Sequence, residues 1–172
     1  MGFPYTRFDL MDPSHIQDIT IHGAVVTVST SRTEDEDRSG AVIRHLLSGA
    51  GISVVHYALV PDEIPVIRQA VLDALEHANL VIVNGGTGLT HDDCTIEAVV
   101  PLLEKTMDGF GELFRLKSYE EIGTRALLSR AIGGVTGGKA VFCVPGSTGA
   151  VTLATSTLII PEIRHILTHA SR

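Results

Sequence analysis

Cysteine, positive charge and long apolar segments are all scarce in this 172-residue chain. Its two cysteines, Cys94 and Cys143, are too few and too isolated for a disulfide framework or a thiolate metal site. No apolar segment is long enough to span a bilayer, and the first residues lack the charged-then-apolar order of a signal peptide. We therefore expect a cytoplasmic protein that has no membrane partner.

Positively charged residues are outnumbered by negatively charged ones. The chain has 13 lysines and arginines against 20 aspartates and glutamates, which gives a formal net charge of −7 at pH 7. Non-specific nucleic-acid binding requires a basic surface that releases counterions, so we expect no nucleic-acid partner. A phosphorylated ligand is still compatible with this charge where lysines, arginines or a metal ion are placed locally.

Length and composition predict one domain. A chain with 44% hydrophobic and 19% charged residues is typical of a globular protein, and its length suffices to bury roughly 70% of the unfolded surface. We assign residues 19–172 to a single α/β domain, preceded by an N-terminal arm at residues 1–18. The arm carries Phe3, Tyr5 and Phe8, which are either disordered or docked on a neighbouring subunit. Docking is favoured, because a soluble chain rarely leaves three aromatic side chains unburied.

Strand and helix patterns alternate along the chain. The patterns predict strands at 19–30, 52–59, 80–83 and 139–144, and helices at 39–50, at 64–75, from 95, at 120–131 and at 151–167. The acidic residues 33–37 are predicted to form a solvated loop, and residues 108–115 to interrupt the helical pattern. Strands separated by helices require crossover connections, so we predict a three-layer α/β/α fold with a mainly parallel, twisted sheet. Ligands bind beyond the carboxyl ends of such strands, where the loops after Leu59, Asn84 and Val144 lie.

A glycine-rich turn follows the third predicted strand. Gly85, Gly86 and Gly88 let backbone N–H groups approach an anion without Cβ interference, and the helix that begins near Thr95 adds its positive N-terminus. The aspartates at 92–93 would repel a phosphate unless Mg²⁺ bridges them, so the segment predicts a nucleotide handled with a divalent cation. The alternative is a tight strand-to-helix turn, because the segment matches neither the G-x-G-x-x-G dinucleotide fingerprint nor a Walker A loop.

Five ordered motifs carry a resemblance to a known family: Gly85-Gly-Thr-Gly, Asp93 with Thr95 and Glu97-Ala98, Gly109-Phe-Gly-Glu-Leu-Phe-Arg115, Leu128-Ser-Arg130 and Pro145-Gly-Ser147. In this order, over residues 19–168, the chain resembles the MogA/MoaB family of molybdenum-cofactor biosynthesis proteins. The stretch Ser118-Tyr-Glu-Glu-Ile-Gly-Thr124 is similar to the MoaB branch. The resemblance implies a three-layer α/β fold, assembly as a trimer or hexamer, and binding of molybdopterin. It further implies Mg²⁺-dependent transfer of AMP from ATP to the terminal phosphate of molybdopterin, with release of pyrophosphate.

The resemblance also implies roles for individual residues. Asp62, in a Val-Pro-Asp turn, and Asp93 are expected to be catalytic and to hold Mg²⁺. The expected nucleotide and phosphate ligands are Gly85, Gly86, Thr87, Gly88 and Glu97. The expected molybdopterin ligands are Pro145, Gly146, Ser147, Thr148, Arg115 and Arg130. ATP and molybdopterin are the implied substrates, and the substrate phosphate is the implied nucleophile.

Each of these side chains has an alternative role in the structure of the protein. Asp62 and Asp93 are positioned to cap helices, and Glu97 lies in a first helical turn, where it favours the helix dipole. The two arginines are as suited to ordinary ion pairs as to anion binding. The Ser147 hydroxyl belongs either to its turn or to a pterin or phosphate contact.

Three positions depart from the family pattern. Ile96 replaces a usual proline, Asp92 replaces a residue that is commonly basic, and Gly149 replaces the lysine of a PGS-x-K pattern. The last two departures remove positive charge near the expected phosphates. Two other functions therefore stay open: a non-catalytic molybdopterin-binding or carrier protein, and a nucleotide-binding scaffold or regulator.

Overall fold

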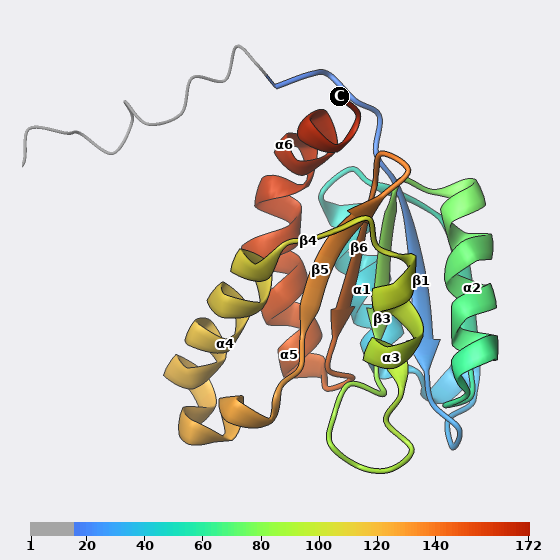
Figure 1. The fold of residues 1–172 in the computed structure, drawn as a ribbon, viewed down its shortest axis with the longest axis vertical. Coiled ribbons are helices and arrows are strands. Elements are labelled where there is room, and N and C mark those ends of the chain that lie inside the picture. The colour runs from blue at the N-terminus through green and yellow to red at the C-terminus, as the bar shows by residue number, and fades with distance from the viewer. Residues whose placement is uncertain (1–15) are drawn as a thin grey trace, which may run out of the picture.

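Runs of β-branched and small apolar residues form the parallel centre of one sheet (Figure 1). The computed structural model describes residues 16–172, and its strands are β1 (His22–Val28), β2 (Ser53–Val60), β3 (Leu80–Asn84), β4 (Lys105–Thr106), β5 (Ile132–Thr136) and β6 (Lys139–Val144). They lie in the order β2-β1-β3-β6-β5-β4. The first four pair in parallel, and β5 and β4 add antiparallel pairs at one edge. The predicted mainly parallel sheet is confirmed.

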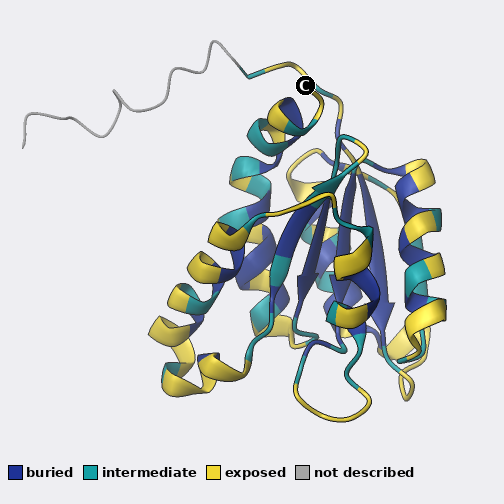
Figure 2. Cartoon of the chain, viewed as in Figure 1, coloured by how far each residue is buried: buried dark blue, intermediate teal, exposed yellow. Residues whose placement is uncertain are grey.

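Helices cover both faces of this sheet, as the three-layer prediction requires. One face carries α1 (Arg38–Gly49), α4 (Asp108–Ile122), α5 (Thr148–Thr152), the π-helical η5 (Leu153–Ile159) and α6 (Ile160–Ala170), and the other carries α2 (Ile64–His77) and α3 (Thr95–Val99). Short 3-10 segments are η2 (Glu34–Glu36), η3 (Val100–Leu102) and η4 (Gly123–Leu128). Figure 2 shows the strands buried between helices whose outer surfaces are exposed. None of the helices in residues 16–172 is long and apolar enough to cross a membrane.

The sequence predicted that residues 108–115 interrupt the helical pattern. This prediction is wrong, because the segment begins α4. Phe110 and Phe114, one turn apart, are buried against the sheet and anchor this helix. Gly111 between them is also buried, and a Cβ there would lie 2.8 Å from the carbonyl oxygen of Ala131. Close packing against the chain before β5 therefore requires this glycine, which does not end the helix.

The helix predicted at 120–131 is wrong over most of its length. α4 ends at Ile122, because Gly123 has a φ of +65°, and the chain continues as η4. β5 follows and is absent from the sequence prediction, since its sequence Ile-Gly-Gly-Val-Thr contains two glycines, which are unusual inside a strand. Packing explains both glycines, because Cβ atoms on Gly133 and Gly134 would overlap neighbouring side chains.

Residues 16–18 run beside the last helix. The Gln17 N–H donates to the Thr168 hydroxyl (3.0 Å), and Arg164 forms an ion pair with Asp18 (3.0 Å). The predicted docking of the three aromatic residues in the arm lies outside the described residues and stays a prediction.

The acidic loop predicted at 33–37 is solvated only in part. The residues of η2 are exposed, as expected, but Asp37 is buried, with an exposed fraction of 2%. Its carboxylate accepts hydrogen bonds from the Thr27 hydroxyl (2.6 Å), the Tyr57 hydroxyl (2.8 Å) and the Gly40 N–H (3.0 Å). These donors come from β1, β2 and the first turn of α1, so one carboxylate joins two strands and a helix.

A second set of buried hydrogen bonds extends this network to β3. The Asn84 amide donates to the Thr27 hydroxyl oxygen (2.9 Å), and its carbonyl oxygen accepts from the Ser39 hydroxyl (2.7 Å). Burial alone would raise the pKa of the Asp37 carboxyl, but the hydrogen bonds described above, led by that from Thr27, outweigh burial and hold its pKa below the usual value. The carboxylate is therefore kept ionised inside the protein, and the carboxyl ends of β1 and β3 are fixed against α1.

We expect Asp37→Asn to lower the free energy of unfolding by about 2–3 kcal/mol at pH 7. An amide has one oxygen, so its NH₂ group would face either the Thr27 and Tyr57 hydroxyls or the Gly40 N–H, and those donors would lose their acceptor. Asp35→Asn, an exposed change in η2, is the matched control and should leave stability unchanged. Urea unfolding measures both.

The stability that the Asp37 carboxylate contributes should depend on pH, because its pKa in the folded protein is lowered. A folded-state pKa below the unfolded value contributes stability above the unfolded pKa, about 3.9, and that stability is lost as the pH falls through the folded pKa. The difference in stability between wild type and Asp37→Asn should therefore shrink on acidification below about pH 4. A difference that stays constant with pH would contradict an ionised Asp37.

Candidate functional site

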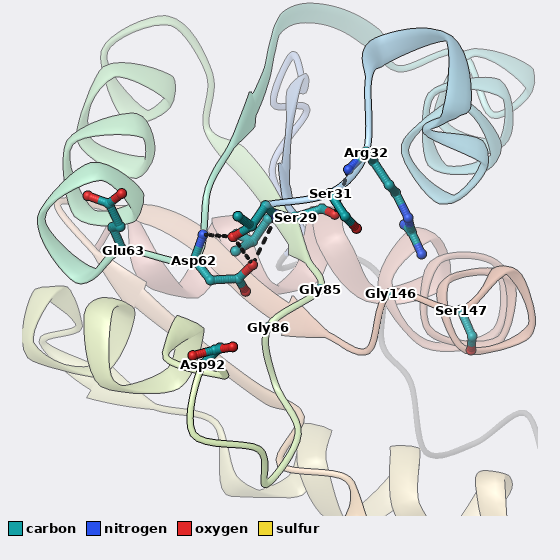
Figure 3. Close-up of a pocket in the computed structure, with 12 residues that line it drawn as sticks. Ser29, Ser31, Arg32, Asp62, Glu63, Gly85, Gly86, Asp92, Gly146 and Ser147 are labelled. Atoms are coloured by element: carbon teal, nitrogen blue, oxygen red, sulfur yellow. Dashed lines mark hydrogen bonds between the residues drawn. The ribbon is translucent and has the colours of Figure 1, made fainter.

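Four loops meet at the carboxyl edge of the parallel strands. They follow β1, β2, β3 and β6, and they enclose a pocket of about 800 Å³ that we call the polar pocket (Figure 3). The residues lining it are Val28, Ser29, Thr30, Ser31, Arg32, Asp62, Glu63, Gly85, Gly86, Asp92, Gly146 and Ser147. Open α/β sheets bind ligands at this edge, and the three loops that the sequence singled out all contribute to the pocket.

A second pocket, of about 310 Å³, adjoins the first and shares Gly86, Gly146 and Ser147 with it. The rest of its wall comes from the glycine turn, α4, η4 and the turn after β6. These residues are Thr87, Gly88, Asp93, Phe114, Ser118, Ile122, Arg125, Ala126, Leu128, Ser129, Pro145 and Ala150. We call this the adjoining pocket, and its boundary with the polar pocket is formed by the two glycine loops.

The first glycine loop has a backbone that a side chain would disrupt. Gly85 and Gly86 have φ values of +94° and +63°. A Cβ on Gly85 would overlap the carbonyl oxygen of Val28, and one on Gly86 would overlap the Thr95 hydroxyl. That hydroxyl donates to the Gly85 carbonyl oxygen (2.8 Å), and the Thr95 N–H donates to the Gly86 carbonyl oxygen (3.0 Å). The turn is therefore held in one shape, in which Gly85 is buried with its N–H donated to the Val144 carbonyl oxygen (3.0 Å), and Gly86 is partly exposed at the boundary.

The turn after β6 supplies the other side of this boundary. A Cβ on Gly146 would lie 3.1 Å from the Gly85 Cα, so the two loops approach closely. Ser147 is the N-cap of α5, and its hydroxyl oxygen accepts from the Ala150 N–H (3.2 Å). The turn role considered for this hydroxyl is thus observed, and its proton is still available to a ligand. The predicted molybdopterin contact of Ser147 stays a prediction.

Asp62 is oriented by the loop after β1. Its Oδ2 oxygen accepts from the Thr30 N–H (3.0 Å) and hydroxyl (2.8 Å), while the Thr30 hydroxyl oxygen accepts from the Asp62 N–H (3.1 Å). The N-cap of α2 is Glu63, and within the described part of the chain no side-chain hydrogen bond caps that helix, so capping does not explain Asp62. A Cβ on Gly86 would lie 3.0 Å from Asp62 Oδ1, which puts this oxygen beside the glycine turn.

Asp93 is held by its own loop. Its Oδ2 oxygen accepts from the Thr90 N–H (3.0 Å) and hydroxyl (2.7 Å). Burial would raise the pKa of the Asp93 carboxyl, but these hydrogen bonds, and one from the Gly88 N–H, outweigh burial and keep its pKa below the usual value. Asp93 lines the adjoining pocket, whereas Asp62 lines the polar pocket. Their joint role at one Mg²⁺ ion stays a prediction.

Arg130 contacts the glycine turn on the side away from the polar pocket. Its Nε donates to the carbonyl oxygens of Thr87 (3.2 Å) and Gly88 (3.0 Å), and its guanidinium forms an ion pair with Glu97. The hydrogen bond from Arg130 lowers the pKa of the Glu97 carboxyl. Arg115 donates instead to a backbone carbonyl just before β5 (3.1 Å). All three charged residues lie outside the linings of both pockets. The contact of Arg130 matches the ion-pair alternative, whereas the hydrogen bond of Arg115 goes to the backbone. Ligand binding by these residues stays a prediction.

The sequence prediction did not include the loop after β1, although residues 29–32 line the polar pocket. Arg32 is the one positively charged residue among those lining this pocket, and Figure 3 shows it across the pocket from Asp62 and Glu63. Its Nη1 donates to the Ser39 hydroxyl (3.1 Å). The signal that could have found it is a hydroxyl-rich run that ends in arginine directly after a buried parallel strand.

The departures from the family pattern occupy three different places. Asp92 lines the polar pocket, where it adds negative charge. Ile96 packs against the apolar core beneath α2 and α3. Gly149 lies in α5 and, like Thr148, lines neither the polar nor the adjoining pocket. Among the described residues, nothing lies within 4 Å of a Cβ placed on Gly149, so a side chain fits there.

Comparisons with known proteins identify the family. Residues 24–165 match the family model described as "Probable molybdopterin binding domain". The chain is 53% identical over 145 residues to molybdenum cofactor biosynthesis protein B of Bacillus cereus, which covers 83% of this chain and 86% of that protein. It is 49% identical over 152 residues to the protein of the same name from Staphylococcus aureus, with 86% and 90% covered.

Solved structures give the same result. A crystal structure of molybdenum cofactor biosynthesis protein B superposes with a TM-score of 0.85 at 50% identity, covering 88% of this chain and 96% of that one. The tungsten cofactor synthesizing protein MoaB from Pyrococcus furiosus superposes with a TM-score of 0.80 at 38% identity, covering 89% and 98%. The fold is therefore the three-layer α/β/α fold of these proteins. The chain belongs to the MogA/MoaB family of molybdenum-cofactor biosynthesis proteins, and the resemblance found in the sequence is confirmed.

Gly85→Ala should destabilise the protein by more than about 2 kcal/mol, because a Cβ would overlap the Val28 carbonyl oxygen and a φ of +94° strains any L side chain. Gly149→Ala is the matched control: its position is helical and open, so the change should be neutral or stabilising by up to about 1 kcal/mol. Urea unfolding compares the two variants. Equal stability would show that the turn does not require glycine at Gly85.

Proposed function

We propose that this protein acts in molybdenum-cofactor biosynthesis by transferring AMP from ATP to the terminal phosphate of molybdopterin, with release of pyrophosphate. The observation that carries the proposal is the pair of pockets that meet at Gly86, Gly146 and Ser147. Two substrates bound on either side of one boundary would have their reacting groups held together, which makes their reaction effectively unimolecular. Membership of the family supports molybdopterin as one of the two substrates.

The polar pocket suits the polyphosphate of ATP. Gly86, which is partly exposed and has a φ of +63°, borders this pocket. Arg32 faces the carboxylates of Asp62 and Asp92 across the pocket (Figure 3). A phosphate chain between these walls would contact a guanidinium on one side and, through a divalent cation, carboxylates on the other. A volume of about 800 Å³ is in the range of small-molecule sites.

The donor set at Asp62 fits a magnesium ion that arrives with the nucleotide. Thr30 donates to Oδ2 of Asp62, whereas Oδ1 lies toward Gly86 and the pocket. Within residues 16–172, no group of three or more His, Cys, Asp or Glu side chains is arranged to hold a metal ion. Mg²⁺ typically keeps several waters and is held by one or two carboxylates together with substrate phosphates, which this site matches. When bound, it would neutralise the charge of the phosphates during transfer.

The adjoining pocket suits molybdopterin, since Phe114 and Ile122 offer apolar contact and Ser147 offers a hydroxyl at the boundary. In the proposed reaction, an oxygen of the molybdopterin phosphate attacks the α-phosphorus of ATP and forms a new P–O bond. The bond from the α-phosphorus to the bridging oxygen breaks, and pyrophosphate leaves with the electron pair. Because the substrate supplies the nucleophile, the protein's residues bind, orient and neutralise charge.

Asp62→Asn and Asp93→Asn should each reduce AMP transfer by roughly a hundredfold or more, because each change removes a hard anionic oxygen near the transferring phosphates. The assay incubates the protein with molybdopterin, ATP and Mg²⁺ and follows pyrophosphate and the adenylylated product. Asp35→Asn is the control for charge, and thermal melting is the control for folding. Unchanged turnover at saturating Mg²⁺ would remove the aspartate concerned from the mechanism.

One observation favours a second candidate function, a non-catalytic molybdopterin carrier. Asp92 stands where the family commonly has a basic residue, so three carboxylates and one guanidinium line the polar pocket. A carrier would bind molybdopterin without releasing pyrophosphate in the assay above. A nucleotide-binding scaffold, the third candidate function, would bind ATP but not molybdopterin.

We also propose that the protein assembles as a homo-oligomer, a trimer or a hexamer, through α4 and η4. Large apolar residues that are each at least 50% exposed follow this surface: Leu113, Leu116, Tyr119, Ile122, Leu127 and Leu128. Leu113, Leu116 and Tyr119 lie on the side of α4 away from the buried Phe110 and Phe114, and Figure 2 shows this side exposed. Ile122 lies at the end of the helix, toward the adjoining pocket. Monomeric proteins seldom expose a contiguous apolar patch of this kind, so a second copy of the chain is its expected cover.

The double variant Leu116→Glu, Leu127→Glu should shift the assembly toward monomers in light scattering, because two charges would be buried at the interface without partners. Leu72→Glu, which changes a residue 41% exposed on α2, is the matched control and should assemble like wild type. A monomeric wild type, or a double variant that assembles equally well, would show that α4 and η4 do not form the interface.

A further inference from the structure

Ser39 lies where the buried hydrogen-bond network meets the polar pocket. It is 1% exposed, in the first turn of α1. Its hydroxyl donates to Asn84 Oδ1 (2.7 Å) and accepts a hydrogen bond from Arg32 Nη1 (3.1 Å). Arg32 itself is exposed and lines the polar pocket. Ser39 thus links buried polar groups to a cation at the candidate ligand site.

The neighbours of Ser39 fix its hydrogen-bonding roles. A hydroxyl has one proton, and two acceptors lie near it: Asn84 Oδ1 at 2.7 Å and Asp37 Oδ1 at 3.3 Å. The shorter contact takes the proton, which leaves the lone pairs of the Ser39 oxygen to accept from the guanidinium. Asn84 and Asp37 are themselves held by buried hydrogen bonds, so the acceptor offered to Arg32 is held in place.

Arg32 needs such an anchor because of the charges that face it. Asp62, Glu63 and Asp92 line the pocket on the other side of the Gly85 loop (Figure 3). A guanidinium on a long, exposed side chain would be drawn toward these carboxylates if it were not tethered. In the structure the guanidinium of Arg32 lies at the opposite wall, beside Gly146. A Cβ placed on Gly146 would be 3.9 Å from Arg32 Nη1.

We propose that Ser39 is a positioning residue for the polar pocket. Its hydroxyl holds the guanidinium of Arg32 at the Gly146 wall, away from the carboxylates, so that a polyphosphate meets a cation already in position. Ser39 does not touch the ligand and acts through Arg32. The inference rests on the proposed nucleotide site in this pocket, and it adds that the buried network sets the affinity of that site.

A double-mutant cycle on ligand affinity tests the proposal. The probe is inorganic tripolyphosphate with Mg²⁺, titrated calorimetrically into the full-length protein. Arg32→Ala should weaken binding by about 10- to 100-fold, the value of a charge-assisted hydrogen bond. Ser39→Ala should weaken it by about three- to tenfold, because a rotamer-rich side chain must then be ordered at binding. The double variant should bind within about twofold of Arg32→Ala, because the effect of Ser39 passes through Arg32.

Two further variants separate positioning from stability. Ser39→Cys keeps nearly the volume of serine but offers a weak acceptor, and it should give the same cycle if Ser39→Ala does not fold. Thr168→Val removes a buried hydroxyl on α6, remote from the pocket, and should lower the melting temperature without changing the affinity. Both variants are also compared with wild type at two salt concentrations. The salt dependence of binding should flatten in Ser39→Cys, which weakens the Arg32 contact, and stay as in wild type in Thr168→Val.

The outcomes distinguish this inference from the proposed function. Wild type that binds tripolyphosphate, with additive effects of the Ser39 and Arg32 changes, would overturn the positioning role and leave the nucleotide site intact. Wild type that shows no polyphosphate binding would overturn the nucleotide site and the positioning role with it. Non-additive effects in the Ser39→Ala or the Ser39→Cys cycle would support the proposal.

Discussion

The buried carboxylate of Asp37 is the group on which the arrangement of the site depends. A charge removed from water is destabilising unless hydrogen bonds replace those it loses, and here Thr27, Tyr57 and Gly40 supply them from two strands and a helix. Because these elements satisfy the charge in one arrangement, the carboxyl ends of β1 and β2 are fixed against α1. The loops that follow these strands are placed by the same contacts, and Arg32 lies at the opposite wall of the polar pocket from Asp62 and Glu63.

The glycine loops complete the site from the other half of the sheet. Gly85 packs against the end of β1, and Gly146 packs against Gly85, so three strand ends approach more closely than side chains would permit. Backbone therefore forms much of the boundary between the pockets, where Ser147 adds one side chain. Arg130 donates hydrogen bonds to two carbonyl oxygens of the first glycine turn and forms an ion pair with Glu97. The turn therefore has its shape before a ligand binds. A site shaped in advance loses less conformational freedom on binding.

The parts of this structure that could be predicted have local signals. A β-branched run indicates a strand wherever it occurs, and a glycine turn after a buried strand indicates a ligand loop. The central strands of the sheet and the loop at Gly85 could therefore be predicted from the sequence. β5 and α4 were not, because their glycines are explained only by side chains and carbonyl groups distant in sequence. The burial of Asp37 depends in the same way on Tyr57, and the place of Arg32 depends on Ser39 and on the turn at Gly146, far along the chain. The family resemblance supplied roles for site residues, and those roles remain predictions.

The shared boundary limits how the two pockets can diverge in evolution. Gly86 borders both pockets, and any side chain there would collide with Thr95 whatever ligand is bound. Residues that border one pocket alone are under no such limit, and they include Asp92 on the polar side and the α4–η4 wall on the other. In the proposed two-substrate site, a substitution at such a residue would change the fit to one ligand, while Gly86 between the two pockets stays glycine.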